Sequence, residues 1–220
     1  MQYLSNLFSQ IDLSSVTGMV LRIVAVFLCL TIHETCHGLA AYMLGDPTAK
    51  QQRRLSLNPI RHIDPLGLIM MFFVGFGWAK PVPVDMRYFK HPKSGMAITA
   101  LAGPLSNFVL AIALLLGCKY MAFNVMATDF TVALYSFLFT TALLSVGLGT
   151  FNLIPIPPLD GSKVLFAFLS DEMYLKLMYY ERYGMLLLLA LSFVGAGNGF
   201  LSTLMNSVFQ GLIALVGLPY

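Results

Sequence analysis

The chain has 220 residues, of which 58% are hydrophobic and only 10% are charged, and its mean hydropathy is +0.78. Soluble domains carry roughly 25% charged residues, so this composition excludes an ordinary water-soluble protein and predicts several membrane-spanning helices. The formal net charge is +3, and the basic residues flank apolar stretches, where membrane topology already accounts for them. We therefore expect no nucleic-acid partner.

The first apolar stretch covers residues 16–44, which is long enough to cross a bilayer, and it contains the sequence HETCH at 33–37. Residues four positions apart lie on one face of a helix, so His33 and His37 can bind the same Zn²⁺ ion. Glu34 would then act as a general base toward a water molecule on that ion. Ionisable groups are costly at membrane depth, which argues against a chance cluster. The motif predicts one zinc ion per chain and hydrolytic chemistry.

Further apolar stretches predict the rest of the fold, and they cover residues 63–79, 96–122, 131–156, 183–197 and 199–217. The stretch at 63–79 is short and rich in glycine, which favours a re-entrant or strand-like segment over a straight helix. The last two stretches predict a helical hairpin. We expect an all-α polytopic membrane protein with about five to six transmembrane helices and a re-entrant or short β segment after the first helix.

Basic residues flank the segment at 63–79 on both sides and predict the orientation of the chain. By the positive-inside rule these flanks are cytoplasmic, which places the N-terminus outside and the HETCH motif in the cytoplasmic part of the first helix. The flanking basic residues are Lys50, Arg53, Arg54, Arg61, Lys80, Arg87, Lys90 and Lys93. Lys119 lies in a loop that is predicted on the opposite side.

A zinc site needs a further protein ligand, and the strongest distant candidate is Asp160. It follows the proline-rich run at 151–159, where the prolines end a helix and leave backbone groups unpaired near the membrane. Such backbone is tolerated where it lines a watery cavity, which Asp160 would face. Asp-Gly is also a common turn pair, so the residues alone leave an interfacial turn as an equal alternative.

The HETCH sequence and the NLIPIPPLDG run at 152–161 together resemble the site-2 protease family of intramembrane zinc metalloproteases, peptidase family M50. Three further runs match in the expected order, namely LNPIRHIDPLG at 57–67, WAKPVPV at 78–84 and AGPLSN at 102–107. The resemblance is to short prokaryotic members without PDZ or CBS domains. It implies a single domain at 1–220, with a catalytic core at about 16–170 and a C-terminal helical hairpin at about 183–217.

The resemblance implies an enzyme that hydrolyses peptide bonds within or near the transmembrane segments of other membrane proteins, in the bacterial inner membrane. Its zinc ligands are expected to be His33, His37 and Asp160, with Glu34 as the catalytic base. A water molecule would complete the tetrahedral site.

Five further residues are less clearly assigned. Asn107 and Asn152 match positions near the active site, where a side-chain amide binds the substrate backbone or stabilises an oxyanion. No chemical step is assigned to His62 or Asp64, for which a structural role is expected. The sulfur of Cys36 adjoins His37 and is a minor alternative ligand, since histidine and carboxylate ligands suffice for catalytic zinc.

The expected partners are transmembrane protein substrates and the lipid bilayer. A substrate helix must unwind locally before it exposes a carbonyl group. Residues 53–57 and 80–84 have an extended pattern, so we expect a small edge sheet that binds the unwound substrate by strand addition, toward the cytoplasmic half of its helix. The short core leaves the choice of substrate to an accessory membrane protein or to prior trimming by another protease.

Two rival functions use the same residues. A divalent-metal transporter would place histidines and carboxylates along an ion path, but it is expected to show several ligand-rich helices or an internal repeat. This chain concentrates its candidate ligands at one site and keeps a glutamate that is not a ligand. A non-catalytic metal-binding membrane protein is disfavoured by the same Glu34.

Overall fold

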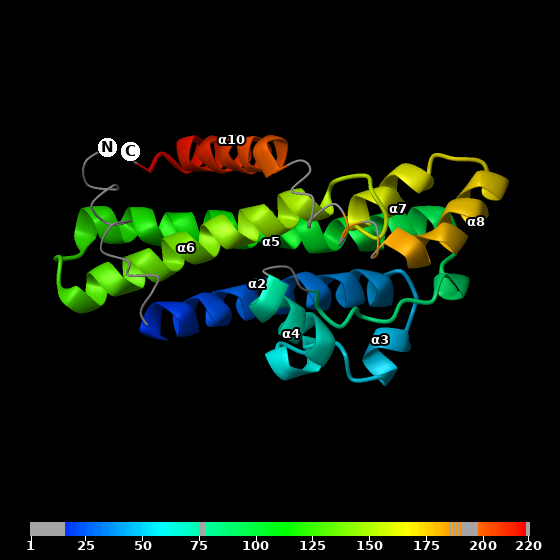
Figure 1. The fold of residues 1–220 in the computed structure, drawn as a ribbon, viewed down its shortest axis with the longest axis horizontal. Helices are drawn as coiled ribbons and strands as arrows, with labels where there is room; N and C mark the ends of the chain where they lie inside the picture. The colour runs from blue at the N-terminus through cyan, green and yellow to red at the C-terminus, as the bar shows by residue number, and fades with distance from the viewer. Residues whose placement is uncertain are drawn as a thin grey trace.

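The computed structural model describes residues 16–74, 78–184, 186, 188, 190 and 198–218. Within them, four helices are long and apolar enough to cross a membrane. They are α2 (Val16–Met43), α5 (Pro92–Asn124), α6 (Asp129–Asn152) and α10 (Asn198–Val216). α5 and α6 lie side by side, with α10 along one side of this pair and α2 along the other (Figure 1). The prediction of an all-helical protein is confirmed in this part of the chain.

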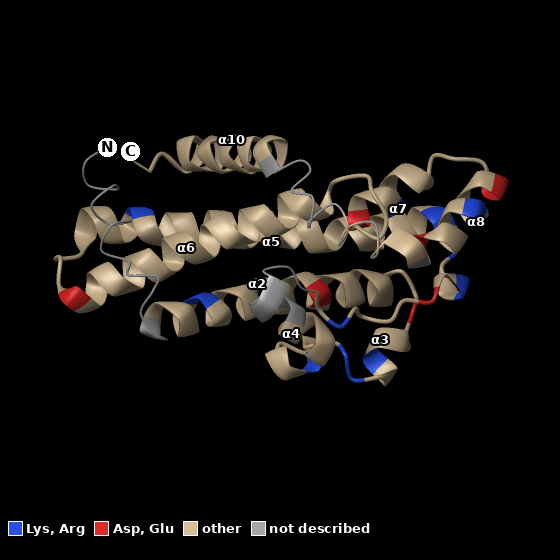
Figure 2. Cartoon of the chain, in the orientation of Figure 1, with Lys and Arg blue, Asp and Glu red and all other residues tan. Residues whose placement is uncertain are grey.

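Shorter elements connect the long helices. The α-helices among them are α3 (Thr48–Gln51), α4 (Pro65–Val74), α7 (Asp160–Phe166) and α8 (Asp171–Tyr180). The 3-10 helices are η1 (Pro59–His62), η2 (Met86–Tyr88) and η3 (Glu181–Tyr183). Many of the basic residues lie on and around α3, α7 and α8, toward one end of the molecule (Figure 2).

Local sequence sets both ends of α6. Thr128 and Thr131 form a capping box at its start, in which each side chain accepts a hydrogen bond from the backbone N–H of the other residue. The helix ends at Asn152, before Pro155, whose ring nitrogen has no hydrogen to donate to a helical carbonyl. The predicted stretch reached residue 156, so the helix is shorter than expected, and turns then lead the chain to Asp160.

A cluster of buried apolar side chains holds α10 against α5 and α6. It contains Leu115 from α5, Phe139 and Val146 from α6, and Phe209 and Ile213 from α10. The rings of Phe139 and Phe209 meet edge to face, with their centroids 5.4 Å apart. Close packing of this kind is what associates helices in lipid, where the hydrophobic effect between them is weak. It holds the end of α6 in place, and with it the turns before Asp160.

The two ends of the segment at 63–79 lie next to each other, after η1 and before the stretch at 80–84. Ile63 and Ala79 form an isolated antiparallel bridge, and the N–H of Lys80 donates to the carbonyl of His62 at 2.9 Å. Between them, residues 65–74 are helical because Asp64 caps the N–H groups of Leu66 and Gly67 at the start of a long apolar run.

The predicted β structure is therefore not confirmed. The described residues contain no sheet, and residues 53–57 and 80–84 do not pair as strands. Arg53 lies in a turn with a positive φ of 55°, so the predicted extended run does not begin there. The predicted span at 183–197 lies mostly outside the described residues. The connection between this span and the predicted span at 199–217 also lies mostly outside them. The count of about five to six spans stays a prediction.

Candidate metal centre

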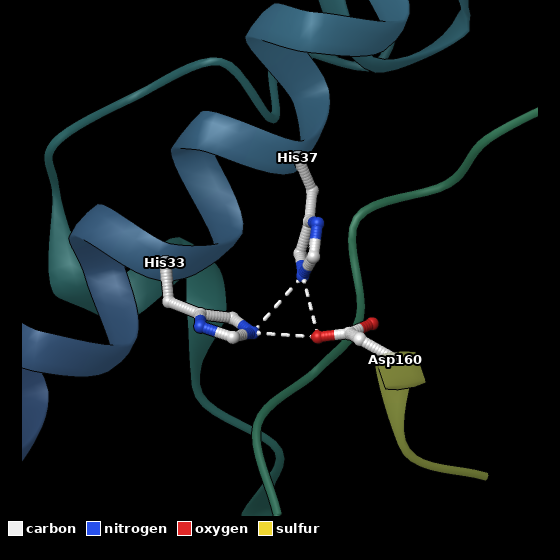
Figure 3. Close-up of side chains that lie close together, drawn as sticks. All are labelled: His33, His37 and Asp160. Atoms are coloured by element: carbon white, nitrogen blue, oxygen red, sulfur yellow. Dashed lines mark hydrogen bonds and ion pairs between the residues drawn. The ribbon is translucent and has the colours of Figure 1, made fainter. Parts of the chain in front are cut away.

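Two histidines from α2 and one aspartate from α7 converge at a single point (Figure 3). The Nε2 atoms of His33 and His37 are 2.9 Å apart. Oδ2 of Asp160 lies 3.1 Å from Nε2 of His33 and 3.2 Å from Nε2 of His37. All three residues are buried. The α-helix brings the two imidazoles together, and the turns after α6 bring the carboxylate to them.

The three atoms have the spacing of ligands around a zinc ion. A tetrahedral ion with bonds of about 2.0–2.1 Å holds its ligand atoms roughly 3.3 Å from one another, close to the observed separations. Within the described residues, His33, His37 and Asp160 form the group of metal-binding side chains that is compact enough to hold an ion. Cys36 is not part of this group. The donor set therefore fits zinc without a sulfur ligand.

Helix α5 orients both imidazole rings. Nδ1 of His33 donates to Oδ1 of Asn107 at 2.6 Å, and Nδ1 of His37 donates to the carbonyl of Thr99 at 2.7 Å. Since each Nδ1 carries the hydrogen, each Nε2 presents its lone pair toward Asp160. Acceptors of this kind commonly fix the tautomer and the ring orientation of metal-binding histidines.

The amide of Asn107 is fully engaged in the interior. Its Nδ2 donates to the carbonyl of Cys29 at 3.3 Å and to Oγ of Ser145 at 3.1 Å, and Oγ of Ser145 donates back to the carbonyl of Asn107 at 2.8 Å. These bonds join α2, α5 and α6 around His33. The contacts give Asn107 a part in holding His33, and its predicted contact with substrate stays a prediction.

Gly103 was not singled out from the sequence, although it faces the histidines directly. A Cβ atom at this position would overlap Cε1 and Nε2 of His37 and would lie 2.7 Å from Nε2 of His33. Thr99, Gly103 and Asn107 follow one another at four-residue intervals, so they share one face of α5. This four-residue spacing, from Thr99 before the AGPLSN run to Gly103 and Asn107 within it, could have identified the face of α5 from the sequence.

The environment of Asp160 favours the ionised form that a metal ligand requires. Burial alone would raise the pKa of its carboxyl group, but the neighbouring His33 and His37 lower it and prevail, so the pKa lies well below its usual range. The next residue, Gly161, packs so closely that a Cβ atom there would overlap the carbonyl of Leu153. The Asp-Gly pair thus belongs to a tightly packed helix start rather than to an exposed turn.

Glu34 lies beside the histidines on the wall of a cavity of about 960 Å³. Its Oε2 accepts a hydrogen bond from the N–H of Val82 at 3.0 Å. The cavity is also lined by His33, His37 and Asp160, so the candidate base and the candidate ligands share one space. Asn152 lines the same cavity, while its Nδ2 donates to the carbonyl of Leu148 on its own helix at 2.9 Å.

His62 and Asp64 make the contacts that structural roles require. Nε2 of His62 donates to the carbonyl of Ser56 at 2.7 Å, and Oγ1 of Thr35 donates to the same carbonyl at 3.0 Å. These bonds fasten the loop after α3 to α2. Asp64 caps α4 through the N–H groups of Leu66 and Gly67, both at 2.9 Å.

Comparison with known proteins decides the family. The model of peptidase family M50 matches residues 121–191, which include Asp160 but not the HETCH motif. YwhC of Bacillus subtilis, whose name assigns it to the zinc metalloproteases, is 36% identical over 195 residues, covering 88% of this chain and 89% of its own. The chain belongs to peptidase family M50.

Two mycobacterial relatives named Rip2, also as zinc metalloproteases, agree with this M50 assignment. The protein of Mycolicibacterium smegmatis is 31% identical over 193 residues, covering 84% of this chain and 71% of its own. That of Mycobacterium tuberculosis is 30% identical over 202 residues, covering 89% of this chain and 73% of its own. No solved structure matches this M50 chain.

Proposed function

We propose that this M50 protein is an intramembrane zinc metalloendopeptidase, which hydrolyses peptide bonds within or near the transmembrane segments of other membrane proteins. The family and the named relatives make it a zinc metalloprotease, and its long apolar helices make it an integral membrane protein. One observation carries the finer proposal. The cluster of His33, His37 and Asp160 lies between helices long enough to span a bilayer, with Glu34 on the same cavity.

In this proposal, His33, His37 and Asp160 hold the cofactor and Glu34 transfers protons. Zinc, when bound, supplies a Lewis acid and lowers the pKa of a coordinated water to near 7. Oε2 of Glu34 is held by Val82, which leaves Oε1 to accept a proton from the attacking water and to deliver it to the leaving amine. Asn107 and Thr99 keep the two imidazoles in one orientation throughout.

The cavity suits a substrate strand that has left its helix. Its walls include residues of α2, α4, α5, α6, α7 and α10 and of the segment at 80–84, from which Pro81, Val82 and Val84 line it. Among the described residues, no group donates to the carbonyl of Val82. We propose that a substrate N–H pairs there, as in strand addition, although the described part of the chain has no preformed sheet. Asn152, which lines the same cavity, is proposed to contact the substrate carbonyl oxygen.

We also propose that the active site lies toward the cytoplasm of a bacterial cell, with the N-terminus outside. The basic residues around α3, α7 and α8 support this orientation (Figure 2). Residues 1–220 would act as one domain whose core at about 16–170 contains the proposed metal ligands and the proposed base. Transmembrane proteins are the proposed substrates, and an accessory membrane protein is proposed to help select them.

The decisive experiment compares cleavage of a panel of single-span substrates in lipid by the wild type, by Glu34→Gln and by a chelator-treated sample, with bound zinc measured in each. Loss of a general base is expected to lower the rate by about 10²–10⁴-fold while zinc stays bound. Glu172→Gln, an exposed change on α8, is the matched control and should cleave normally. A wild type that binds zinc, cleaves no substrate and carries metal into vesicles would establish the transporter instead.

A further inference from the structure

A second pocket, of about 360 Å³, lies among the residues between α3 and α4 and the start of the extended segment. Four of its lining side chains are cationic, and none is acidic. The cations are Arg53, Arg54, Arg61 and Lys80. We call this site the basic pocket. It is separate from the metal centre, although Ile63 lines both.

The charges of the basic pocket have no counter-ion within the described part of the chain. Other cations do find acids there: Lys93 pairs with Asp171 at 2.5 Å, and Lys163 pairs with Glu181 at 3.4 Å. None of the four pocket cations forms such a pair with a described acidic residue. Cations held close together without an acid repel one another, so the arrangement favours a bound anion.

The unpaired positive charge is most costly at Arg54, because this residue is nine-tenths buried. Its Nη2 donates to the carbonyl oxygens of Lys80 at 2.7 Å and Pro81 at 3.3 Å, and both acceptors are neutral. Its Nε has no hydrogen-bond partner among the described residues. A buried charge is normally paired with an opposite one, because removal from water is costly. The burial of Arg54 without an acidic partner among the described residues therefore favours a bound anion.

The surroundings of the basic pocket suit a membrane interface, because exposed apolar residues flank its cations. Leu57, Ile60, Leu66 and Ile69 are large apolar residues next to it in the chain, and each is more than half exposed. The part of the chain that contains these residues follows Met43, which is the last residue of the candidate membrane span in α2. Apolar side chains beside a cluster of cations insert into the acyl region while the cations stay at the level of the lipid phosphates.

We propose that the basic pocket binds the phosphate group of an anionic phospholipid. Guanidinium groups suit this ligand because their paired N–H donors match two phosphate oxygens at once. The bound phosphate would supply a counter-charge to Arg54, which pairs with no acid in the described part of the chain. Arg54 in turn holds the carbonyls of Lys80 and Pro81, directly before Val82, so the site adjoins the segment that contacts Glu34.

The test uses the full-length protein, delipidated in a neutral detergent, and measures binding of three probes by calorimetry. These are short-chain phosphatidylglycerol, short-chain phosphatidylcholine and inorganic phosphate. The variant is Arg53→Gln with Arg61→Gln, two exposed residues of the pocket. The matched control is Lys90→Gln with Lys176→Gln, which removes the same charge from exposed positions outside the pocket.

We expect saturable binding of phosphatidylglycerol, weakened about thirty-fold in the pocket variant, since each cation near a lipid surface contributes about a fivefold change in affinity. The control should bind within about twofold of the wild type. Equal losses in variant and control, or equal binding of phosphatidylcholine, would overturn the proposal. If inorganic phosphate binds as tightly as the lipid, the pocket binds free phosphate rather than a lipid headgroup, and the proposal is overturned.

A second variant keeps the result interpretable if the first folds poorly. Lys80→Gln removes an exposed cation, whereas the contacts with His62 and Arg54 use only the backbone of Lys80 and are retained. It should weaken phosphatidylglycerol binding about fivefold. Unchanged bound zinc and an unchanged unfolding temperature show that each variant is folded.

Discussion

The backbone N–H of Val82 donates a hydrogen bond to Oε2 of Glu34 at 3.0 Å, across 48 positions of sequence. A backbone donor is fixed more firmly than a side chain, so it sets the direction of the carboxylate. The extended segment at 80–84 thus has two parts in the proposed mechanism. It forms one wall of the cavity, and it holds the general base.

Replacement of Val82 by proline removes the N–H that donates to Glu34 and keeps the backbone carbonyl of residue 82. The segment is already extended and already contains Pro81 and Pro83, so proline is compatible with its conformation. We expect kcat to fall about 10- to 100-fold, which is the usual range for a lost hydrogen bond to a charged group, with bound zinc unchanged. Steady-state cleavage of a single-span substrate measures the effect.

Val82→Ala is the control, because it removes most of the same side chain and keeps the N–H. It should retain kcat near that of the wild type. If alanine and proline lower kcat equally, the side chain of Val82 matters and the hydrogen bond to Glu34 does not.

Gly103→Ala is expected to abolish zinc binding. The added methyl group would overlap Nε2 of His37 and lie 2.7 Å from Nε2 of His33, in the space that a metal ion needs. Alanine stabilises a helix by about 1 kcal/mol relative to glycine, so any loss cannot come from helix propensity. Zinc per chain, measured by elemental analysis, gives the result.

The matched control for Gly103 is Gly211→Ala in α10, where an added Cβ meets nothing within 4 Å. This variant should bind zinc normally. Full zinc occupancy in Gly103→Ala would mean that α5 can move away from the histidines, and that the metal centre is less tightly enclosed than its packing indicates.

Asn107→Ala tests whether the amide serves His33 or the substrate. Loss of a hydrogen-bond partner behind a metal ligand typically weakens metal affinity by about 10- to 100-fold, and we expect a loss in this range. Competition with a chromophoric chelator measures it, and Asn124→Ala, an exposed change on the same helix, should have no effect. Unchanged zinc affinity with a raised KM would instead indicate that Asn107 contacts the substrate.

The proposed orientation predicts which cysteines react from which side. With the native cysteines replaced by alanine, Asn124→Cys at the end of α5 should react with an impermeant maleimide in intact cells. Lys90→Cys and Lys176→Cys should react only in inverted membrane vesicles. Labelling in the reverse pattern would place the metal centre near the outer surface.

The candidate metal centre was partly predictable, because two of its residues are neighbours on one helix and the third is distant in sequence. His33 and His37 are brought together by helix geometry alone, which four-residue spacing reveals. Asp160 reaches them only through the packing of α5 and α6, and its residues alone left an interfacial turn equally plausible. The resemblance to a family supplied what local pattern could not.

Errors in the fold arose where local preferences compete. The glycines around residues 67–77 favoured a strand-like segment, but the cap by Asp64 and the apolar run after it made residues 65–74 helical. Gly103 and Thr99 were missed because their importance depends on which face of α5 turns toward α2. The rotation of α5 about its own axis is decided by packing between helices. Hydrophobic periodicity does not reveal this rotation when all faces of a helix are apolar.

His33 and Asp160 are 127 positions apart, so an ion held between them also acts as a cross-link that closes a long ring of chain. Such a tether removes conformational freedom from the unfolded ensemble, by an amount that grows with the logarithm of ring size. The C-terminal part of α2, all of α5 and all of α6 lie inside the ring. Metal supply would therefore govern how long the folded protein persists in the cell as well as whether it can cleave.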